Sequence, residues 1–478
     1  MMRRYIPINF THVADMDGVG CAVLSKIAFN GSFINSCEGY FDSPFIVPLG
    51  NNTENVANSF NMDKFKDYVH NDFEHMKHLI EEVILSGNYE SEIPAENNYE
   101  EITFIVIVTD IHVPLSEINK FRDRLTTEYP GCDINVWQID HHESNPYWKE
   151  TAKESLVIVD YCYDKGCLDD SVIICTSSVN NGFSIDSESF TKRHIQHVGI
   201  KMLHHDEAFY RYNILTEYGF FDHPEARRSA TFIYFLYLYE AGLLTHLTRD
   251  QFISLVKFVY HVSNYDTFEF DRLDGFIPVK SDAPDALAVL YKSYHGDFFK
   301  FLNLMYTFIR ISSLNREPLN DKYPDVPIPD QFVEKLDIFY TERQFQFNSD
   351  LNAVRIVPYA IVRRVLMIKS QELKDSDLVA IYPKDITDAS FTGNTLLKMY
   401  NIKMVIMMYT SSCILSFRSN NHDLSAPNVS EIAKELNGGG HKNASGCTLP
   451  YNKFIELLKL AWYTTPGISD DLKTVKDE

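Results

Sequence analysis

The stretch Ile-Thr-Phe-Ile-Val-Ile-Val-Thr-Asp, residues 102–110, indicates the fold. Its apolar run from Ile102 to Val108 is typical of a strand buried on both faces, which occurs mainly in parallel sheets. Residues 5–11, 134–139 and 156–159 predict further strands, and residues 21–29 and 63–85 have the apolar spacing of helices. Because strands and helices alternate, the sequence predicts an α/β fold with a parallel sheet flanked by helices.

The rest of the chain predicts a second, smaller α/β domain. Residues 190–310 are expected to be mostly helical, and the proline- and aspartate-rich residues 316–330 form the best candidate linker. Beyond the linker, short strands are expected at 365–368, 378–382, 404–408 and 413–417. We therefore expect a first domain at 1–315 with helical insertions at about 35–100 and 165–225. A second domain would follow at 331–466, with a cleft between the two domains and a flexible tail at 467–478.

Composition and charge restrict the class of protein. The chain has 478 residues, of which 45% are hydrophobic and 23% charged, as in soluble globular proteins. Its net charge of −22 argues against a protein that binds nucleic acid through bulk positive charge. It does not argue against a metal-dependent nuclease, because divalent cations supply positive charge at the phosphate. Eight scattered cysteines and no long apolar segment favour a cytoplasmic protein that does not enter a membrane.

Acidic and histidine side chains follow several of the predicted strands. His12, Asp15 and Asp17 follow the first strand, Asp110 follows the run at 102–108, and the Asp140–His142 triplet follows the next strand. Ligand sites in open α/β sheets lie at the carboxyl ends of the strands. Buried carboxylates are costly unless a cation offsets them. Two divalent cations about 3.5–4 Å apart would bind a phosphate between them. Asp15 and Asp17 are equally compatible with plain helix capping.

The order of these motifs resembles the DHH phosphoesterase family. Asp15-Met16-Asp17-Gly18, then Asp110, then Asp140-His141-His142, match its motifs in sequence, and Asp266 within residues 264–268 fits the fourth. Near the C-terminus, residues 438–446 match a GGGHxxAxG signature, and residues 415–419 resemble the arginine strand of the DHH-associated C-terminal domain. Residues 15–29 are most similar to nanoRNase B-type oligoribonucleases. The resemblance therefore implies a DHH catalytic domain at 1–315 and a substrate-binding domain at 331–466.

The resemblance implies a role for each matched residue. Two divalent cations, expected to be Mn²⁺, would be held by side chains at the strand ends. One would take His12, Asp15 and Asp110, and the other would take Asp17, Asp110, His141 and Asp266, with Asp110 bridging. Asp140 would orient a ligand histidine, and His142 would face the scissile phosphate as hydrogen-bond donor or general acid. Arg418 and the loop Gly438, Gly439, Gly440 and His441 would bind the substrate's remote phosphate.

These roles imply a metal-dependent exoribonuclease that releases nucleoside monophosphates from short RNA. The alternatives are a cyclic-dinucleotide phosphodiesterase or 3′-phosphoadenosine phosphate phosphatase, and a non-catalytic nucleic-acid-binding scaffold on the same fold. Short RNA or a nucleotide is the expected partner. The sequence names no protein partner and is compatible with a homodimer. Arg227 and Arg228, which precede an expected helix, are expected at the surface.

Overall fold

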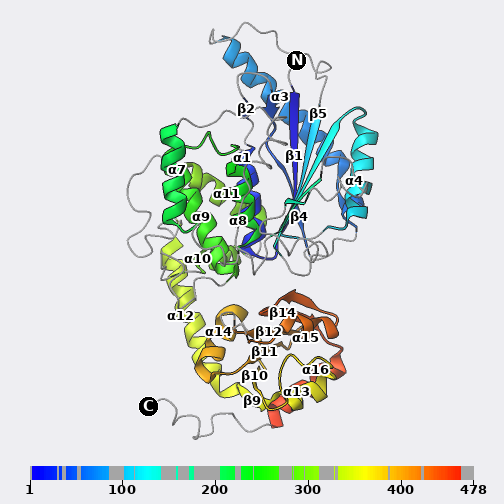
Figure 1. Ribbon diagram of the computed structural model, residues 1–478, viewed down its shortest axis with the longest axis vertical. Coiled ribbons are helices and arrows are strands. Elements are labelled where there is room, and N and C mark those ends of the chain that lie inside the picture. Colours follow the sequence, from blue (N-terminus) through cyan, green and yellow to red (C-terminus); the bar gives the residue numbers. More distant parts are fainter. Residues whose placement is uncertain are drawn as a thin grey trace. The chain divides into compact units, whose positions relative to one another are not determined.

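The computed structural model describes most of the chain as two compact units (Figure 1). Unit 1 extends to Val333 and unit 2 begins at Glu334. The described residues are 3–29, 32–34, 39–50, 55–85, 102–111, 113–141, 158–159, 172–176, 205–220, 228–240, 242–267, 283, 285–294, 297–311, 328, 332–385, 388–420 and 425–463. The predicted α/β class is confirmed, since each unit contains one sheet with helices packed on it.

Unit 1 is built on a mostly parallel sheet. Its strand order is β2-β3-β1-β5-β6-β8-β7, and β4 also pairs with β1. The pairs of β1 with β3, β4 and β5 are parallel, as are β5–β6 and β6–β8, whereas β2–β3 and β7–β8 are antiparallel. The strands are β1 Arg3–His12, β2 Ser32–Ile34, β3 Gly39–Phe41, β4 Phe45–Leu49, β5 Ile102–Thr109, β6 Asp133–Asp140, β7 Ile158–Val159 and β8 Val172–Thr176.

Helices cover both faces of this sheet (Figure 1). On one face, α1 and α8 lie against the central strands, with α9, α10 and α11 packed around α1. On the other face, α2, α3 and α4 form an aromatic-rich core with β1 and β5. The helices of unit 1 are α1 Met16–Ala28, α2 Val56–Ser59, α3 Met62–Leu85, α4 Leu115–Glu128, α7 His205–Glu217, α8 Ala230–Glu240, α9 Arg249–Thr267, α10 Ala286–Ser293 and α11 Phe298–Ile311.

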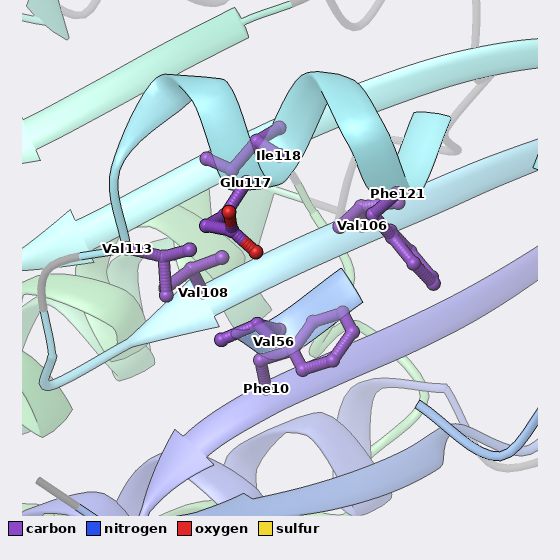
Figure 2. A pocket seen from close by; sticks show the side chains of 8 residues that line it. All are labelled: Phe10, Val56, Val106, Val108, Val113, Glu117, Ile118 and Phe121. Atoms are coloured by element: carbon purple, nitrogen blue, oxygen red, sulfur yellow. The ribbon is translucent and has the colours of Figure 1, made fainter. Parts of the chain in front are cut away.

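Two charged side chains of helix α4, Glu117 and Arg124, contact the short helix α2 and the residue after it. Figure 2 shows the carboxylate of Glu117 among apolar side chains of the β1–β5 core. A hydrogen bond from Lys120 lowers the pKa of Glu117, which favours the ionised form of this carboxyl. One turn before the end of α4, Arg124 donates hydrogen bonds to the backbone carbonyls of Ala57 and Phe60. We assign this hollow a structural role, because its remaining lining is apolar.

Unit 2 has a six-stranded sheet in the order β13-β14-β12-β11-β10-β9. Only β10 and β11 run parallel, and the other neighbours are antiparallel. The elements are α12 Val333–Asp350, β9 Arg355–Pro358, α13 Tyr359–Leu366, β10 Leu378–Tyr382, α14 Ala389–Tyr400, β11 Met404–Tyr409, β12 Ile414–Ser419, α15 Val429–Glu435, β13 Gly439–His441, β14 Ala444–Thr448 and α16 Tyr451–Tyr463. Two cores of buried side chains lie on the two faces of the sheet.

Three expectations from the sequence were wrong. Residues 365–368 are not a strand, because buried Tyr359, Val362 and Leu366 repeat at helical spacing and place this run at the end of α13. Residues 35–100 and 165–225 are not simply helical insertions, since β3 and β4 in the first segment and β8 in the second extend the sheet. Arg228 is not at the surface, because its guanidinium is buried against the Phe232 ring and donates to the carbonyl of Gly219. Arg227 lies outside the described residues.

None of the described helices combines the length and the apolar character that a membrane span requires.

A buried ion pair in unit 1 gives a test of the packing. Arg4 and Asp42 are both buried and joined by two hydrogen bonds, and Arg4 also donates to the carbonyl of Val69 on α3. We expect Asp42→Ala to lower the free energy of unfolding by about 3–5 kcal/mol, because it leaves the Arg4 charge buried without its carboxylate. Denaturant titration followed by circular dichroism measures this loss.

The partly exposed pair of Lys66 and Glu128 is the matched control. Glu128→Ala should cost less than about 1 kcal/mol, because water solvates the remaining charge. Equal losses in the two variants would contradict the assignment of Arg4 and Asp42 as a structural pair.

Candidate metal centre

The loop between β1 and α1 brings three potential ligands to the carboxyl end of the sheet. Asp15 is the N-cap of α1, and its Oδ1 accepts hydrogen bonds from the backbone N–H groups of Asp17 and Gly18. A Cβ at position 18 would overlap the carbonyl oxygen of His12, so only glycine allows the helix to begin this close to the strand. The hydroxyl of Thr11 donates to the Gly18 carbonyl at 2.7 Å and closes the turn.

Asp110 occupies the first position after β5 in an unfavourable backbone conformation. Its φ of +57° lies in the left-handed region, which costs a non-glycine residue roughly 1–2 kcal/mol. The backbone N–H of Asp110 donates to the Ile139 carbonyl of the neighbouring strand β6 at 2.9 Å, which holds the residue in this conformation. Strain of this kind gathers at functional sites, where the surrounding structure maintains it. The strained backbone at Asp110 therefore lowers the stability of the fold but sets the direction in which the Asp110 carboxylate points.

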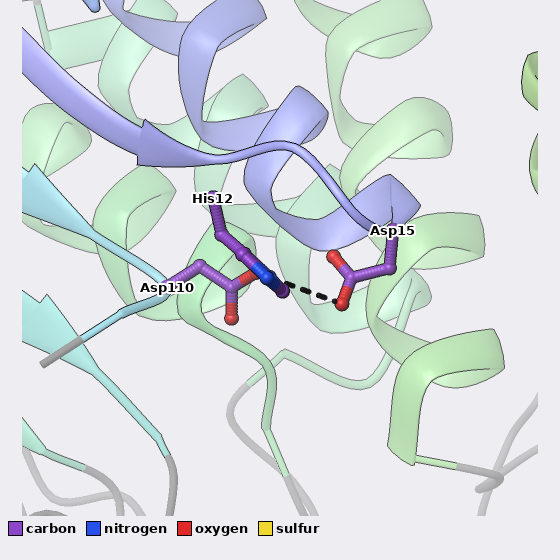
Figure 3. Close-up of side chains that lie close together, drawn as sticks. All are labelled: His12, Asp15 and Asp110. Carbon is purple, nitrogen blue, oxygen red and sulfur yellow. Dashed lines mark ion pairs between the residues drawn. The ribbon is translucent and has the colours of Figure 1, made fainter. Parts of the chain in front are cut away.

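The first group of potential ligands consists of His12, Asp15 and Asp110 (Figure 3). The Nδ1 atom of His12 lies 3.4 Å from Asp15 Oδ2 and 3.6 Å from Asp110 Oδ2. One potential ligand atom from each of the three residues lies within 4.8 Å of the others. Asp15 therefore uses one oxygen as a helix cap and turns the other towards His12, so the capping role and the ligand role are compatible.

The second group consists of Asp17, Asp110 and His141. His141 Nε2 lies 3.4 Å from Asp17 Oδ2 and 3.4 Å from Asp110 Oδ1. The same nitrogen lies 3.4 Å from Asp266 Oδ2, which comes from the last turn of α9. Asp110 is thus shared, with Oδ2 towards the first group and Oδ1 towards the second. Asp266 contacts the second group through His141.

The structure also locates Asp140, the residue before His141. Asp140 is fully buried, and its Oδ1 accepts a hydrogen bond from the backbone N–H of His141 at 2.9 Å. It is not part of either ligand group among the described residues. Its carboxylate therefore fixes the backbone that carries His141. His142 lies outside the described residues.

The charges of this cluster suit divalent cations. Burial lowers the pKa of His12, but hydrogen bonds and charges from Asp110 and Asp15 outweigh it and raise the pKa to about 11. Burial raises the pKa of Asp266 well above its usual value, and the charge of Asp17 adds to this. Several acidic groups thus share a small buried volume, where their mutual repulsion is weakly screened. Carboxylate and imidazole together are the donor set of Mn²⁺ and related ions, so the residues fit such a centre.

In unit 2, Arg418 lies on β12 beside the start of α14. Its Nη1 donates to Ser416 Oγ and to the Phe417 carbonyl, each at 2.9 Å. Its stem packs on Gly393 of α14, where a Cβ would come within 2.6 Å of Arg418 Cγ. Arg418 is partly exposed as a residue, and these contacts hold it in a defined place on the sheet.

The structure explains why residues 438 and 440 are glycines but not why residue 439 is one. A Cβ at Gly438 would overlap the Gly446 carbonyl, and Gly440 has a φ of +132° that other residues rarely adopt. A Cβ at Gly439, in contrast, would meet no atom within 4 Å. His441 ends β13 and is partly exposed. Packing therefore requires glycine at 438 and 440 but leaves the glycine at 439 unexplained by the fold.

Sequence reasoning did not single out the residues that hold these ligands in place. The N–H groups of Ala230 and Thr231, at the start of α8, donate to Asp17 Oδ2 and Oδ1, both at 2.8 Å. The hydroxyl of Tyr291 on α10 donates to the carbonyl of Val13 in the loop between His12 and Asp15 at 2.7 Å. Only the fold brings these residues, more than 200 positions away, to the loop, and no local pattern marks them.

Comparison with known proteins supports the resemblance in unit 2. Residues 379–465 match the model of the DHHA1 domain, which is the DHH-associated C-terminal domain. The match covers β10 to α16 and includes Arg418 and the 438–441 loop. The match lies within unit 2 and is consistent with the motifs at 415–419 and 438–446. No curated protein is significantly similar in sequence.

Solved structures align over most of the chain at low similarity. An uncharacterised protein from Helicobacter pylori G27 is 14% identical over 96% of this chain and 99% of its own, with a TM-score of 0.22. The pGpG-specific phosphodiesterase PggH from Vibrio cholerae is 11% identical over 96% and 99%, with a TM-score of 0.36. RecJ in complex with Mg²⁺ from Thermus thermophilus is 11% identical over 96% and 50%, with a TM-score of 0.33. These scores are too low to assign a function by similarity.

The raised histidine pKa values predict how metal binding depends on pH. Burial lowers the pKa of His141, but the charges of Asp266 and Asp17 outweigh it and raise the pKa, as those of Asp110 and Asp15 do at His12. In the metal-free protein His12 therefore holds a proton near neutral pH, and the raised pKa of His141 favours its protonated form too, so a bound cation must displace protons. We expect Mn²⁺ affinity to fall as pH falls from 8 to 6, by about tenfold per pH unit for each displaced proton.

Calorimetric titration in buffers of different ionisation enthalpy counts the protons released. His12→Gln should release fewer protons than the unchanged protein, because one of the titrating imidazoles is gone. An affinity that stays constant between pH 6 and 8 would contradict this account of the site.

Proposed function

We propose that this chain is a metal-dependent phosphoesterase that hydrolyses short oligoribonucleotides to nucleoside monophosphates. The observation that supports it most directly is the position of Asp110, whose two oxygens face the two ligand groups. Such a shared carboxylate is the feature that a pair of divalent cations requires. The alternative of a non-catalytic scaffold is less consistent with this arrangement, because a scaffold gains nothing from the strained backbone at Asp110.

In this proposal, His12, Asp15 and Asp110 hold one cation, and Asp17, Asp110, His141 and Asp266 hold the other. Divalent cations there would offset the charge of the phosphate and increase the acidity of a water molecule. Asp140 fixes the backbone of His141 through its hydrogen bond. His142 is proposed to donate a proton or hydrogen bond to the departing oxygen. The expectation of Mn²⁺ rather than Mg²⁺ comes from the two imidazole donors.

Unit 2 is proposed to bind the phosphate at the end of the substrate that is not cut. Arg418 offers a planar guanidinium, which can bind a phosphate through two parallel hydrogen bonds. Residues 439–441 form the edge strand β13, whose outward-facing backbone N–H groups are proposed to bind the phosphate, and Gly439 leaves space for it to approach. Residues 334–478 carry 17 acidic and 17 basic side chains, so the whole net charge of −22 belongs to residues 1–333. A polyanion would therefore meet less repulsion at unit 2.

Replacing the shared carboxylate tests the proposed chemistry. Asp110→Asn keeps the size of the side chain but removes its charge, so we expect turnover to fall by about 10³-fold or more. The assay follows release of mononucleotides from 5′-labelled RNAs of two to about twenty nucleotides, with Mn²⁺ and with EDTA. The proposal expects cleavage only with Mn²⁺ and fastest for the shortest RNAs.

Asp133→Asn is the matched control, because Asp133 is exposed at the opposite end of the neighbouring strand β6. Its activity should equal that of the unchanged protein. Full activity in Asp110→Asn would refute the two-cation chemistry. Cleavage of cyclic dinucleotides or 3′-phosphoadenosine phosphate in place of RNA would refute the proposed substrate while leaving the chemistry intact.

Substitutions of Gly438 and Gly439 test the contributions of this segment to folding and to phosphate binding separately. Gly439→Ala should leave thermal stability unchanged, because its Cβ meets no atom within 4 Å. It should raise the KM for RNA by about tenfold, because a methyl group would hinder the approach of a phosphate to the backbone. Gly438→Ala should instead lower the melting temperature, since its Cβ overlaps the Gly446 carbonyl. An unchanged KM in Gly439→Ala would argue against phosphate binding at this loop.

A further inference from the structure

Helix α8 holds Asp17 in place through hydrogen bonds to its carboxylate. Both of its carboxylate oxygens accept backbone N–H groups from the first turn of α8, from Ala230 and Thr231, at 2.8 Å each. The start of a helix carries unpaired N–H groups and a partial positive charge, so it favours a carboxylate in this position. The Asp17 carboxylate is fully buried, so water does not compete for these hydrogen bonds.

Thr231 makes a third bond to the same residue. Its hydroxyl donates to the backbone carbonyl of Asp17 at 2.6 Å, while its N–H donates to the Asp17 carboxylate at 2.8 Å. The main chain and the side chain of Asp17 are therefore both fixed by one residue of α8. Two contacts from a single rigid donor define an orientation, whereas one contact would define only a distance.

The sequence of α1 is adapted to this contact. Gly20 faces Thr231, and a Cβ at position 20 would overlap Thr231 Oγ1 and come within 2.9 Å of its Cγ2. Cys21 Sγ lies 3.6 Å from the same hydroxyl and takes part in its hydrogen bonding. Helix α1 thus has no side chain at the position where Thr231 must enter. Any larger residue at 20 would push α8 away from Asp17.

We propose that Thr231 is a positioning residue that orients Asp17 towards the second ligand group, and that it acts through Asp17 alone. This inference rests on the proposed metal centre. The first group contains His12, Asp15 and Asp110 but not Asp17, and no bond from Thr231 to these three residues is found among the described contacts. Loss of the Thr231 hydroxyl should therefore weaken one of the two cation sites selectively. A general loss of stability would weaken both.

The test is calorimetric titration of the full-length protein with Mn²⁺, supported by electron paramagnetic resonance of the bound ion. Thr231→Val keeps the shape and the backbone N–H but removes the hydroxyl. It should raise the Kd of one of two Mn²⁺ ions by about 10–100-fold, the usual effect of removing a residue that orients a ligand, and leave the other Kd unchanged. Thr231→Ser restores the hydroxyl and should restore both Kd values. Gly20→Ala should reproduce the selective loss.

Tyr291→Phe is the matched control, because it removes a hydroxyl that donates to the carbonyl of Val13 on the other side of the same loop. The Kd value that Thr231→Val raises should be unaffected in Tyr291→Phe. If the unchanged protein binds two Mn²⁺ ions and Thr231→Val binds both equally well, or loses both equally, the inference fails and the proposed function stands. If the unchanged protein binds no Mn²⁺, the proposed function fails, and the role of Thr231 fails with it.

Discussion

The repulsion among carboxylates at one edge of the unit 1 sheet is the constraint on which the rest of the site depends. Asp17 and Asp110 are almost completely buried, and Asp15 and Asp266 lie beside them with two imidazoles between. A fold does not gather such charges without compensation, because each ionised group loses its hydration. Three kinds of compensation are visible in unit 1. The start of α8 holds Asp17, the first turn of α1 holds Asp15, and the imidazoles lie between the carboxylates.

The sequence predicted the central strands β1, β5 and β6 of unit 1 better than the short strands beside them. The run at 102–109 is apolar at nearly every position, so burial on both faces left little doubt about its structure. Short strands such as β3 and β4 were missed, because β3 has only three residues and a proline interrupts the apolar run of β4. The strand expected at 365–368 was wrong because four apolar residues in a row are compatible with the end of a helix.

The candidate ligands could be predicted because they follow strands, and parallel strands bring their carboxyl ends to one edge. Asp110, Asp17 and His141 thus meet, although more than 120 positions separate the first and last of them. The supporting residues could not be predicted, since Thr231 is one threonine in an apolar helix and its partner lies 214 positions away. Its role depends on how helices α1 and α8 pack, and no local pattern in the sequence predicts that packing. The sequence pointed to Gly438, Gly439 and Gly440 alike, and only the structure separates Gly439, which has open space around it, from the other two.

Asp15 has a consequence for how this chain can change over generations. One of its oxygens caps α1, and the other faces His12. Substitution at this position removes a helix cap, which typically costs about 1 kcal/mol of stability, and also removes a potential ligand. A residue that serves two purposes is penalised twice when it mutates, once through the abundance of folded protein and once through its activity. Such a position resists neutral drift even in a lineage whose substrate is changing, so the start of α1 should outlast the specificity built around it.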